Sequence, residues 1–269
     1  MPDTIGISPI LSRADRVAAE QVRAVYRSVP VGVFGALFGV VVLAWVLIYS
    51  DRATAERVGI WLGITVVTAI WQFVLWFRYR RSKTQDSRWR IWAGVFCVAS
   101  FLEGCRWGLG EIWLATPGSI DQQLWVLLVA TSASASSVSS LGSYTPAFYA
   151  LLGPATVPFA IWSAARGGTL HWAMALLDLV FATAVALLGL AQSRALARAL
   201  ELRFENLELA EDLRTQKEKA EVANAAKSTF LAAASHDLRQ PLHALGMFAA
   251  PLGGRRLDAD ARRLTDQMV

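Results

Sequence analysis

The chain has 269 residues, of which 55% are hydrophobic and only 17% are charged. A soluble domain carries charges at about a quarter of its positions, so this balance and the mean hydropathy of +0.40 indicate a membrane protein. The formal charge is +5, but the basic residues gather at the ends of long apolar runs. This placement argues against a nucleic-acid partner and for a lipid membrane.

The first 27 residues are polar and carry charges of both signs, so no cleavable signal peptide is visible. Apolar residues recur there at spacings of three and four, at Leu11, Ala14, Ala18, Val22 and Val25. Ser12 and Asp15 can form a capping pair at the start. Residues 1–27 are therefore predicted to form a short amphipathic helix on the cytoplasmic membrane surface. The alternative is a frayed tail.

Six apolar segments follow, over residues 29–49, 58–77, 91–115, 123–143, 147–165 and 172–192. Most are close to the roughly 20 residues that a helix needs to cross a bilayer. Pro154 and Pro158 predict a kink or a break in the fifth segment. We expect an all-α membrane protein with a six-helix transmembrane bundle over residues 28–192.

The orientation of the bundle follows from basic residues between the segments. The loop after the second segment holds Arg78, Arg80, Arg81, Lys83, Arg88 and Arg90, with Asp86 as its single acid. Loops rich in Lys and Arg stay in the cytoplasm, and the N-terminal tail is basic too. Six spans then bring both termini to the cytoplasmic side.

Cys97 and Cys105 both lie in the third segment. Eight helical residues rise about 12 Å, which is too far for a disulfide within one helix. Their spacing matches no metal motif, so both are interpreted as packing residues and no metal site is predicted.

Residues 193–226 are expected to form one long helix that continues the sixth segment. The stretch is charged and free of Pro and Gly. Its apolar seam shifts partway, from Leu196, Leu200 and Leu207 to Leu202, Leu209, Leu213, Ala220 and Ala223. Such a shift is typical of a signalling coiled coil in a dimer. A stiff amphipathic linker is the alternative.

The last stretch, residues 227–269, has a heptad pattern. Every seventh residue is leucine at Leu231, Leu238, Leu245 and Leu252, and a second seam holds Ala234, Pro241 and Phe248. His236 falls on the face opposite these seams, so we expect it to be exposed. Asp237 follows directly, and its carboxylate can orient the imidazole and take up its proton.

Residues 230–242 read Phe-Leu-Ala-Ala-Ala-Ser-His-Asp-Leu-Arg-Gln-Pro-Leu. This segment resembles the H-box of the dimerisation and phosphotransfer domain of sensor histidine kinases, in the version found in hybrid kinases. The resemblance implies that His236 accepts a phosphoryl group from ATP and passes it to a response-regulator aspartate. It makes Asp237 the candidate general base. Gln240 stands where many members have a Thr or Asn that positions water for phosphatase activity.

The resemblance also implies a homodimer in a bacterial inner membrane, a phosphorelay, and a response regulator or a fused receiver domain as partner. Pro251-Leu-Gly-Gly is expected to be the turn after the first helix of a truncated domain, and a second helix is expected from about Asp260. No ATP-binding box, P-loop or Rossmann fingerprint occurs in the chain. No cofactor is therefore predicted here, and ATP and Mg²⁺ are expected on a separate catalytic domain.

Polar residues inside the apolar segments are the candidates for sensing, because the outer loops are too short to form a ligand domain. Glu103 and Arg106 stand three apart and can pair. Asp178 lies in the sixth segment, and the fourth carries Ser132, Ser136, Ser139 and Ser143 on one face. We expect a polar pocket among the third, fourth and sixth segments. The alternative is that these groups only hold the helices together.

Small residues four apart predict close helix packing at two places, Gly104 with Gly108 and Gly35 with Gly39. The whole architecture is similar to the membrane sensors of quorum-sensing kinases that detect small lipid-like signals. Two other functions stay open. A transporter-like receptor would need internal repeats, which the sequence does not show. A non-catalytic membrane adaptor would only dimerise.

Overall fold

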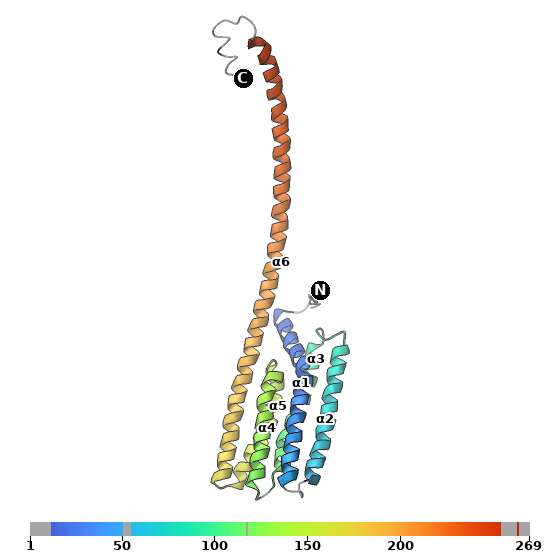
Figure 1. The fold of residues 1–269 in the computed structure, drawn as a ribbon, viewed down its shortest axis with the longest axis vertical. Helices are drawn as coiled ribbons and strands as arrows, with labels where there is room; N and C mark the ends of the chain where they lie inside the picture. Colours follow the sequence, from blue (N-terminus) through green and yellow to red (C-terminus); the bar gives the residue numbers. More distant parts are fainter. Residues whose placement is uncertain (1–11, 51–54, 117, 254–262, 264–269) are drawn as a thin grey trace. The chain divides into compact units, whose positions relative to one another are not determined.

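The computed structural model describes residues 12–50, 55–116, 118–253 and 263 (Figure 1). The helices of this part are α1 (Arg13–Ser50), α2 (Ala55–Arg81), α3 (Trp89–Leu114), α4 (Ile120–Leu141), α5 (Thr145–Arg166) and α6 (Thr169–Gly253). Within these residues there is no strand, which confirms the all-α class. The chain divides into two units, one up to Arg203 and one from Phe204.

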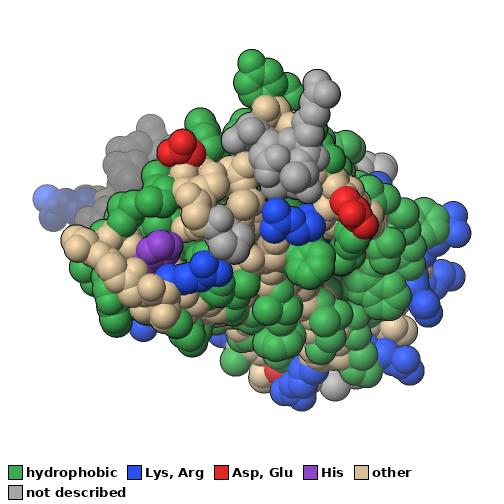
Figure 2. Space-filling view, turned by 90° about the horizontal axis from the view of Figure 1, so that it is seen from below, with side chains coloured by type: hydrophobic (Ala, Val, Ile, Leu, Met, Phe, Trp, Pro, Cys, Tyr) green, Lys and Arg blue, Asp and Glu red, His purple; other side chains and the backbone are tan. Residues whose placement is uncertain are grey.

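Five of the described helices are long and apolar enough to cross a membrane, namely α1, α2, α4, α5 and α6. The remaining helix, α3, also has 26 residues but carries Glu103, Arg106 and Glu111. Large apolar side chains point outward, such as Phe38 with 73% of its surface exposed, and Figure 2 shows hydrophobic side chains over much of one face. An apolar exterior of this extent fits a lipid environment.

The start of α1 differs from the expected separate surface helix. Ser12 caps it, because the Asp15 amide donates to Ser12 Oγ at 3.2 Å, so the predicted capping pair is confirmed. The helix then continues without interruption through Pro30 into the first apolar segment. Val22 and Tyr26 are buried, and the Tyr26 ring stacks on Tyr79 of α2 at 3.8 Å.

This continuity has a simple physical cause. The apolar positions of residues 13–27 are in phase with Val29 and Val33 of the following segment, so one face runs along the whole helix. That face packs against the ends of α2 and α3, where Tyr26 also donates to the Trp92 carbonyl at 3.1 Å. Packing within the protein therefore takes the place of packing on a membrane surface.

The backbones of α3 and α5 approach each other closely. A methyl group on Gly104 would lie 2.3 Å from the Leu151 carbonyl oxygen, and one on Gly108 would lie 2.1 Å from that of Pro154. The close packing predicted for this glycine pair is confirmed. The other pair makes no such close backbone approach, because nothing lies within 4 Å of the Cβ position of Gly35 and that of Gly39 meets only the Val129 side chain, at 3.8 Å.

Of the kink or break expected in α5, the break does not occur, since the helix is continuous through Pro154 and Pro158. Pro158 has no amide hydrogen, so it cannot bond to the carbonyl oxygen of Pro154 four residues earlier. That oxygen instead faces Gly108 of α3. A neighbouring helix can support a proline inside a spanning helix in this way.

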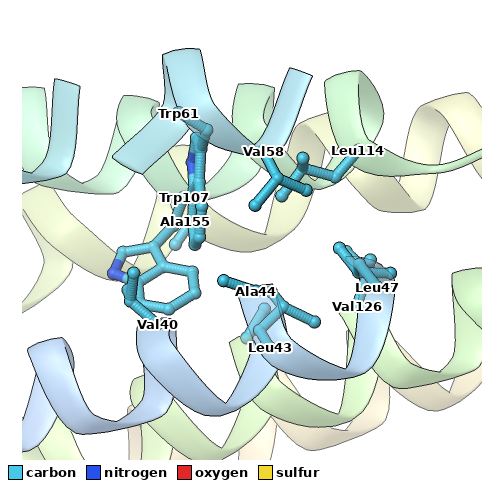
Figure 3. Close-up of a cluster of buried hydrophobic side chains, with 11 residues drawn as sticks. Val40, Leu43, Ala44, Leu47, Val58, Trp61, Trp107, Leu114, Val126 and Ala155 are labelled. Atoms are coloured by element: carbon cyan, nitrogen blue, oxygen red, sulfur yellow. The ribbon is translucent and has the colours of Figure 1, made fainter. Parts of the chain in front are cut away.

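A layer of large apolar side chains fills the bundle (Figure 3). It includes the following residues of five helices: Val40, Leu43, Leu47, Val58, Trp61, Trp107, Leu114, Val126 and Ala155. The rings of Trp61 and Trp107 meet edge to face at 5.4 Å. This arrangement is favourable for aromatic pairs and fixes both side chains next to Arg106.

Helix α6 has 85 residues, and its first part belongs to the bundle through buried residues such as Met174 and Val185. It continues far beyond the sixth apolar segment, as predicted, and stays helical through Pro241. It ends at Gly253, within the predicted turn. The helix expected from about Asp260 lies outside the described residues.

Candidate functional site

A cavity of about 100 Å³ lies inside the bundle, lined by residues of α1, α2, α3, α4 and α5. The contribution of α1 is mainly apolar, with Val29, Val33 and Leu37. The other helices add polar groups, which are Thr65, Thr68, Gln72, Ser100, Glu103, Arg106, Ser134, Ser136, Ser137 and Ser140. The cavity therefore combines an apolar wall with a polar one, as small-molecule sites do.

The Glu103–Arg106 pair forms the charged part of the cavity wall. Arg106 Nε donates to both carboxylate oxygens of Glu103 at 3.1 Å, and Nη2 donates to Oε1. Both side chains are withdrawn from solvent, with 3% of Arg106 and 10% of Glu103 exposed. The pairing expected from their spacing is thus present, and it compensates two charges that would be costly alone.

Three further residues hold the Arg106 guanidinium in place. Nη1 donates to Thr65 Oγ1 at 2.9 Å, and the ring centroids of Trp61 and Trp107 lie 5.3 and 4.7 Å from the guanidinium carbon. The two rings attract the cation and keep anions away from it. Sequence spacing did not reveal Thr65 and Trp61 as partners, because they come from α2. Trp107 follows Arg106 directly on α3, and adjacent residues do not share a helix face.

The serines of α4 face the cavity differently from the prediction. Ser136 lines the cavity, but Ser132 does not, and Ser132 Oγ donates to the Leu128 carbonyl at 2.7 Å. The buried serines that α4 contributes to the lining are Ser134 and Ser137. Ser134 and Ser137 lie on the same helix face as buried Val126 and Ala130. The spacing of the apolar residues in α4 could therefore have identified the face that points into the bundle.

Asp178 is buried but belongs to another place in the bundle. None of the described residues that line the cavity comes from α6. The prediction that the sixth segment contributes to the pocket is therefore wrong. Asp178 is 2% exposed and lies within electrostatic range of Glu111. Glu111 is eight residues beyond Glu103, about 12 Å along α3, which explains the separation.

The beginning of α1 connects several elements at one end of the bundle. Arg23 forms ion pairs with Glu20 and with Asp86 in the loop between α2 and α3. Gln21 Nε2 donates to both the carbonyl oxygen and Oγ of Ser193 on α6 at 3.3 Å. Helix α1 is therefore bonded both to the basic loop and to the long helix.

Arg13 adds a second bond to α6, since its Nη2 donates to the Glu201 carbonyl at 3.0 Å. Asp15 contributes on the loop side, where Arg90 Nη2 donates to its carboxylate at 2.9 Å. The prediction of a surface helix missed all these contacts. The sequence contained one indication of these contacts, because Asp86 is the single acid in a basic loop and pairs with Arg23.

In the second unit, His236 lies on an exposed helix surface. Its side chain is 68% exposed, and Nδ1 lies 3.5 Å from Asp237 Oδ1, at the upper limit for a hydrogen bond. The seam leucines of this helix are exposed too, with 52% for Leu231, 65% for Leu238 and 54% for Leu245. A single chain thus leaves both the histidine face and the apolar seam open.

The described residues contain no group of three or more His, Cys, Asp or Glu that could hold a metal ion. Cys97 and Cys105 are free thiols. No protein-family model, curated protein or solved structure matches the chain. Function must therefore be inferred from the chemistry of the two regions just described.

Proposed function

We propose that this chain is the membrane sensor and phosphoacceptor region of a two-component sensor histidine kinase. The observation that carries the proposal is His236, exposed beside the Asp237 carboxylate on a helix that begins among apolar spans. Around it stands the Ser-His-Asp-Leu-Arg-Gln-Pro-Leu segment. A phosphoacceptor must be reachable by another domain, and this histidine is.

The chemistry follows from the two ring nitrogens. A proton on Nδ1 directed at Asp237 leaves the lone pair of Nε2 free to attack. Nε2 forms a bond to the γ-phosphorus of ATP held by a separate catalytic domain, the bond from that phosphorus to the ADP oxygen breaks, and Asp237 takes up the Nδ1 proton. The phosphoryl group then passes to an aspartate of a response regulator. Gln240, one turn further on, can orient water for a phosphatase role, in which water attacks the regulator's aspartyl phosphate and releases inorganic phosphate.

A second copy of the chain is the proposed partner of the apolar seam. Leu231, Leu238 and Leu245 recur at the heptad spacing and are more than half exposed in one chain. Such a stripe is stabilised by packing against the same stripe of another helix. The homodimer would bury the leucines and leave His236 on the outside.

The membrane bundle is the proposed sensor, with both termini in the cytoplasm of a bacterium. The cavity beside Glu103 and Arg106 supplies the polar groups that a site within the bilayer requires. Bonds from Gln21 and Arg13 to α6 supply a route by which a change in the bundle acts on the signalling helix.

The test uses the chain in lipid nanodiscs with an ATP-binding domain fused behind it or added in trans. Labelled ATP is expected to transfer phosphate to the chain as an acid-labile, alkali-stable adduct. His236→Gln is expected to abolish the adduct, and His243→Gln, one heptad further on the same face, is expected to keep it. Labelling that survives in the His236→Gln variant refutes the assignment, and no adduct on the unmodified chain favours a non-catalytic adaptor.

A further inference from the structure

The end of α2 and the loop after it carry cations that the protein does not neutralise. These exposed residues, which we call the basic cluster, are Arg78, Arg80, Arg81, Lys83 and Arg88. None of them has an ion-pair partner among the residues that the structure describes. Asp86, the single acid of the loop, pairs with Arg23 of α1 instead. The charge of the basic cluster is therefore available to an external anion.

The basic cluster lies next to an apolar surface of α2. Trp71 and Phe77 expose 53% and 47% of their surface. The guanidinium carbon of Arg80 lies 5.4 Å from the ring centroid of Trp76, and that of Arg81 lies 4.1 Å from the ring centroid of Phe77. Both arginines thus lean back over the preceding turn, as long helical side chains do. Their charges are held at the edge of the apolar span.

The loop that carries the rest of the basic cluster is internally bonded. Gln85 Nε2 donates to the Tyr79 carbonyl at 2.7 Å, and the Ser82 amide donates to the same oxygen at 3.0 Å. The Arg88 amide donates to the Thr84 carbonyl at 3.1 Å. These bonds fix the backbone between α2 and α3 before any ligand arrives. Less conformational entropy is then lost on binding.

From these observations we propose that the basic cluster binds the headgroup of an anionic phospholipid, whose acyl chains lie along Trp71, Val74 and Phe77. Arginine matches the oxygens of a phosphate with two parallel donors, and the exposed apolar side chains suit the acyl chains. A soluble phosphate or an acidic peptide would use the charge and leave the apolar surface uncovered.

The lipid site goes beyond the proposed sensor and does not involve His236. The cytoplasmic leaflet carries the anionic lipids, and the proposed topology places this loop there. A zwitterionic phospholipid has a phosphate too, but its own cation compensates it. The site is therefore expected to prefer lipids with net negative charge.

The experiment uses the chain in nanodiscs that contain a small fraction of phosphatidylglycerol with a diazirine in one acyl chain, so that light attaches the lipid where it binds. Phosphatidylcholine with the same acyl chains is the matched probe. Phosphatidylglycerol is expected to label peptides of residues 70–92 at least about tenfold more, because each cation near a membrane surface contributes about fivefold. Equal labelling by the two lipids would overturn the proposal.

Paired variants test the residues. Arg80→Gln with Arg81→Gln is expected to lower the phosphatidylglycerol labelling about tenfold and to leave that of phosphatidylcholine unchanged. Arg214→Gln with Lys217→Gln is the matched control of equal charge change, since both residues already have acidic partners on their own helix, and should have no effect. Equal loss in both pairs would contradict the assigned site.

A charge-conserving pair separates binding from folding. Arg80→Lys with Arg81→Lys keeps both cations, so at least about half of the labelling is expected to remain. A loss as large as in the glutamine pair would contradict binding by charge.

Two measurements on the unmodified chain decide the matter if the variants fail to fold. Raising the salt from about 0.1 M to about 1 M shortens the Debye length from about 10 Å to about 3 Å, so the preference for phosphatidylglycerol should fall at least about threefold. A preference that salt does not change would contradict the proposal.

Soluble competitors test the choice of a lipid. Glycerophosphoglycerol, which is the same headgroup without acyl chains, and hexaglutamate are not expected to compete at the concentration of the probe. Full competition by the first would assign the site to soluble phosphates, and by the second to an acidic peptide, and either result would overturn the lipid proposal. No readout uses ATP, so absence of phosphate on His236 contradicts the kinase proposal alone.

Discussion

The bundle and the helix after Phe204 use the same types of residue in opposite ways. In the bundle, Leu47 and Phe148 are completely buried, and the ion pair of Glu103 and Arg106 is shielded by aromatic rings. In the second unit Leu238 is 65% exposed. The bundle therefore buries these side chains within one chain, whereas the second unit leaves the leucines of its seam exposed.

Ion pairs show the same contrast and provide the largest expected effect. Glu103→Gln leaves a buried cation partly uncompensated, so we expect it to lower the free energy of unfolding by about 3–5 kcal/mol. Glu218→Gln breaks a pair with Arg214 whose side chains are 72% and 63% exposed, and should cost less than about 0.5 kcal/mol. Chemical unfolding in mixed micelles measures both.

The double variant Glu103→Gln with Arg106→Gln sharpens this prediction. Removing both charges avoids the uncompensated cation, so at least half of the lost stability should return. A loss as small for Glu103→Gln as for Glu218→Gln would show that the buried pair contributes no more than a surface pair.

The next largest effect is expected for Gly108→Ala. Its methyl group would overlap the Pro154 carbonyl oxygen at 2.1 Å and force α3 away from α5, at a cost of about 3 kcal/mol. Gly35→Ala is the matched control, because nothing lies within 4 Å there, and it should be neutral or stabilising by up to about 1 kcal/mol. Thermal unfolding compares the two, and equal melting temperatures would contradict the packing.

In the second unit, a substitution in the seam is expected to change dimerisation and not the stability of the fold. Leu238→Glu places a charge in the proposed seam, so dimerisation should weaken about thirtyfold, corresponding to about 2 kcal/mol. Thr229→Glu, on the face opposite the seam, should leave dimerisation unchanged. Analytical ultracentrifugation measures both, and an unaltered dimer with Leu238→Glu would contradict a seam between two copies.

The smallest effect concerns the bond between α1 and α6. Gln21→Ala removes the contacts to Ser193, and loss of one such interaction costs about 1 kcal/mol, so amide exchange around Ser193 should rise about fivefold. Gln85→Ala is the control, because Gln85 donates to the Tyr79 carbonyl at 2.7 Å and not to α6. Hydrogen–deuterium exchange with peptide mapping distinguishes the two variants.

The sequence by itself determined the helices and the interactions that lie within one helix. Each of the six predicted apolar segments corresponds to a helix, because about 20 apolar residues in a row can be buried only that way in a bilayer. Glu103 and Arg106 could be paired from their spacing, since residues three apart share a helix face. The glycines at 104 and 108 likewise predicted a close approach, although not the helix that approaches.

The tertiary structure alone decided which helices meet. It placed Thr65 and Trp61 of α2 against Arg106, turned Ser134 toward the cavity in place of Ser132, and kept Asp178 of α6 away from it. Helix periodicity gives the direction of each side chain around its own axis. Neighbouring helices are chosen by the fit of whole surfaces, such as Gly108 against the Pro154 carbonyl, and no single helix contains that information.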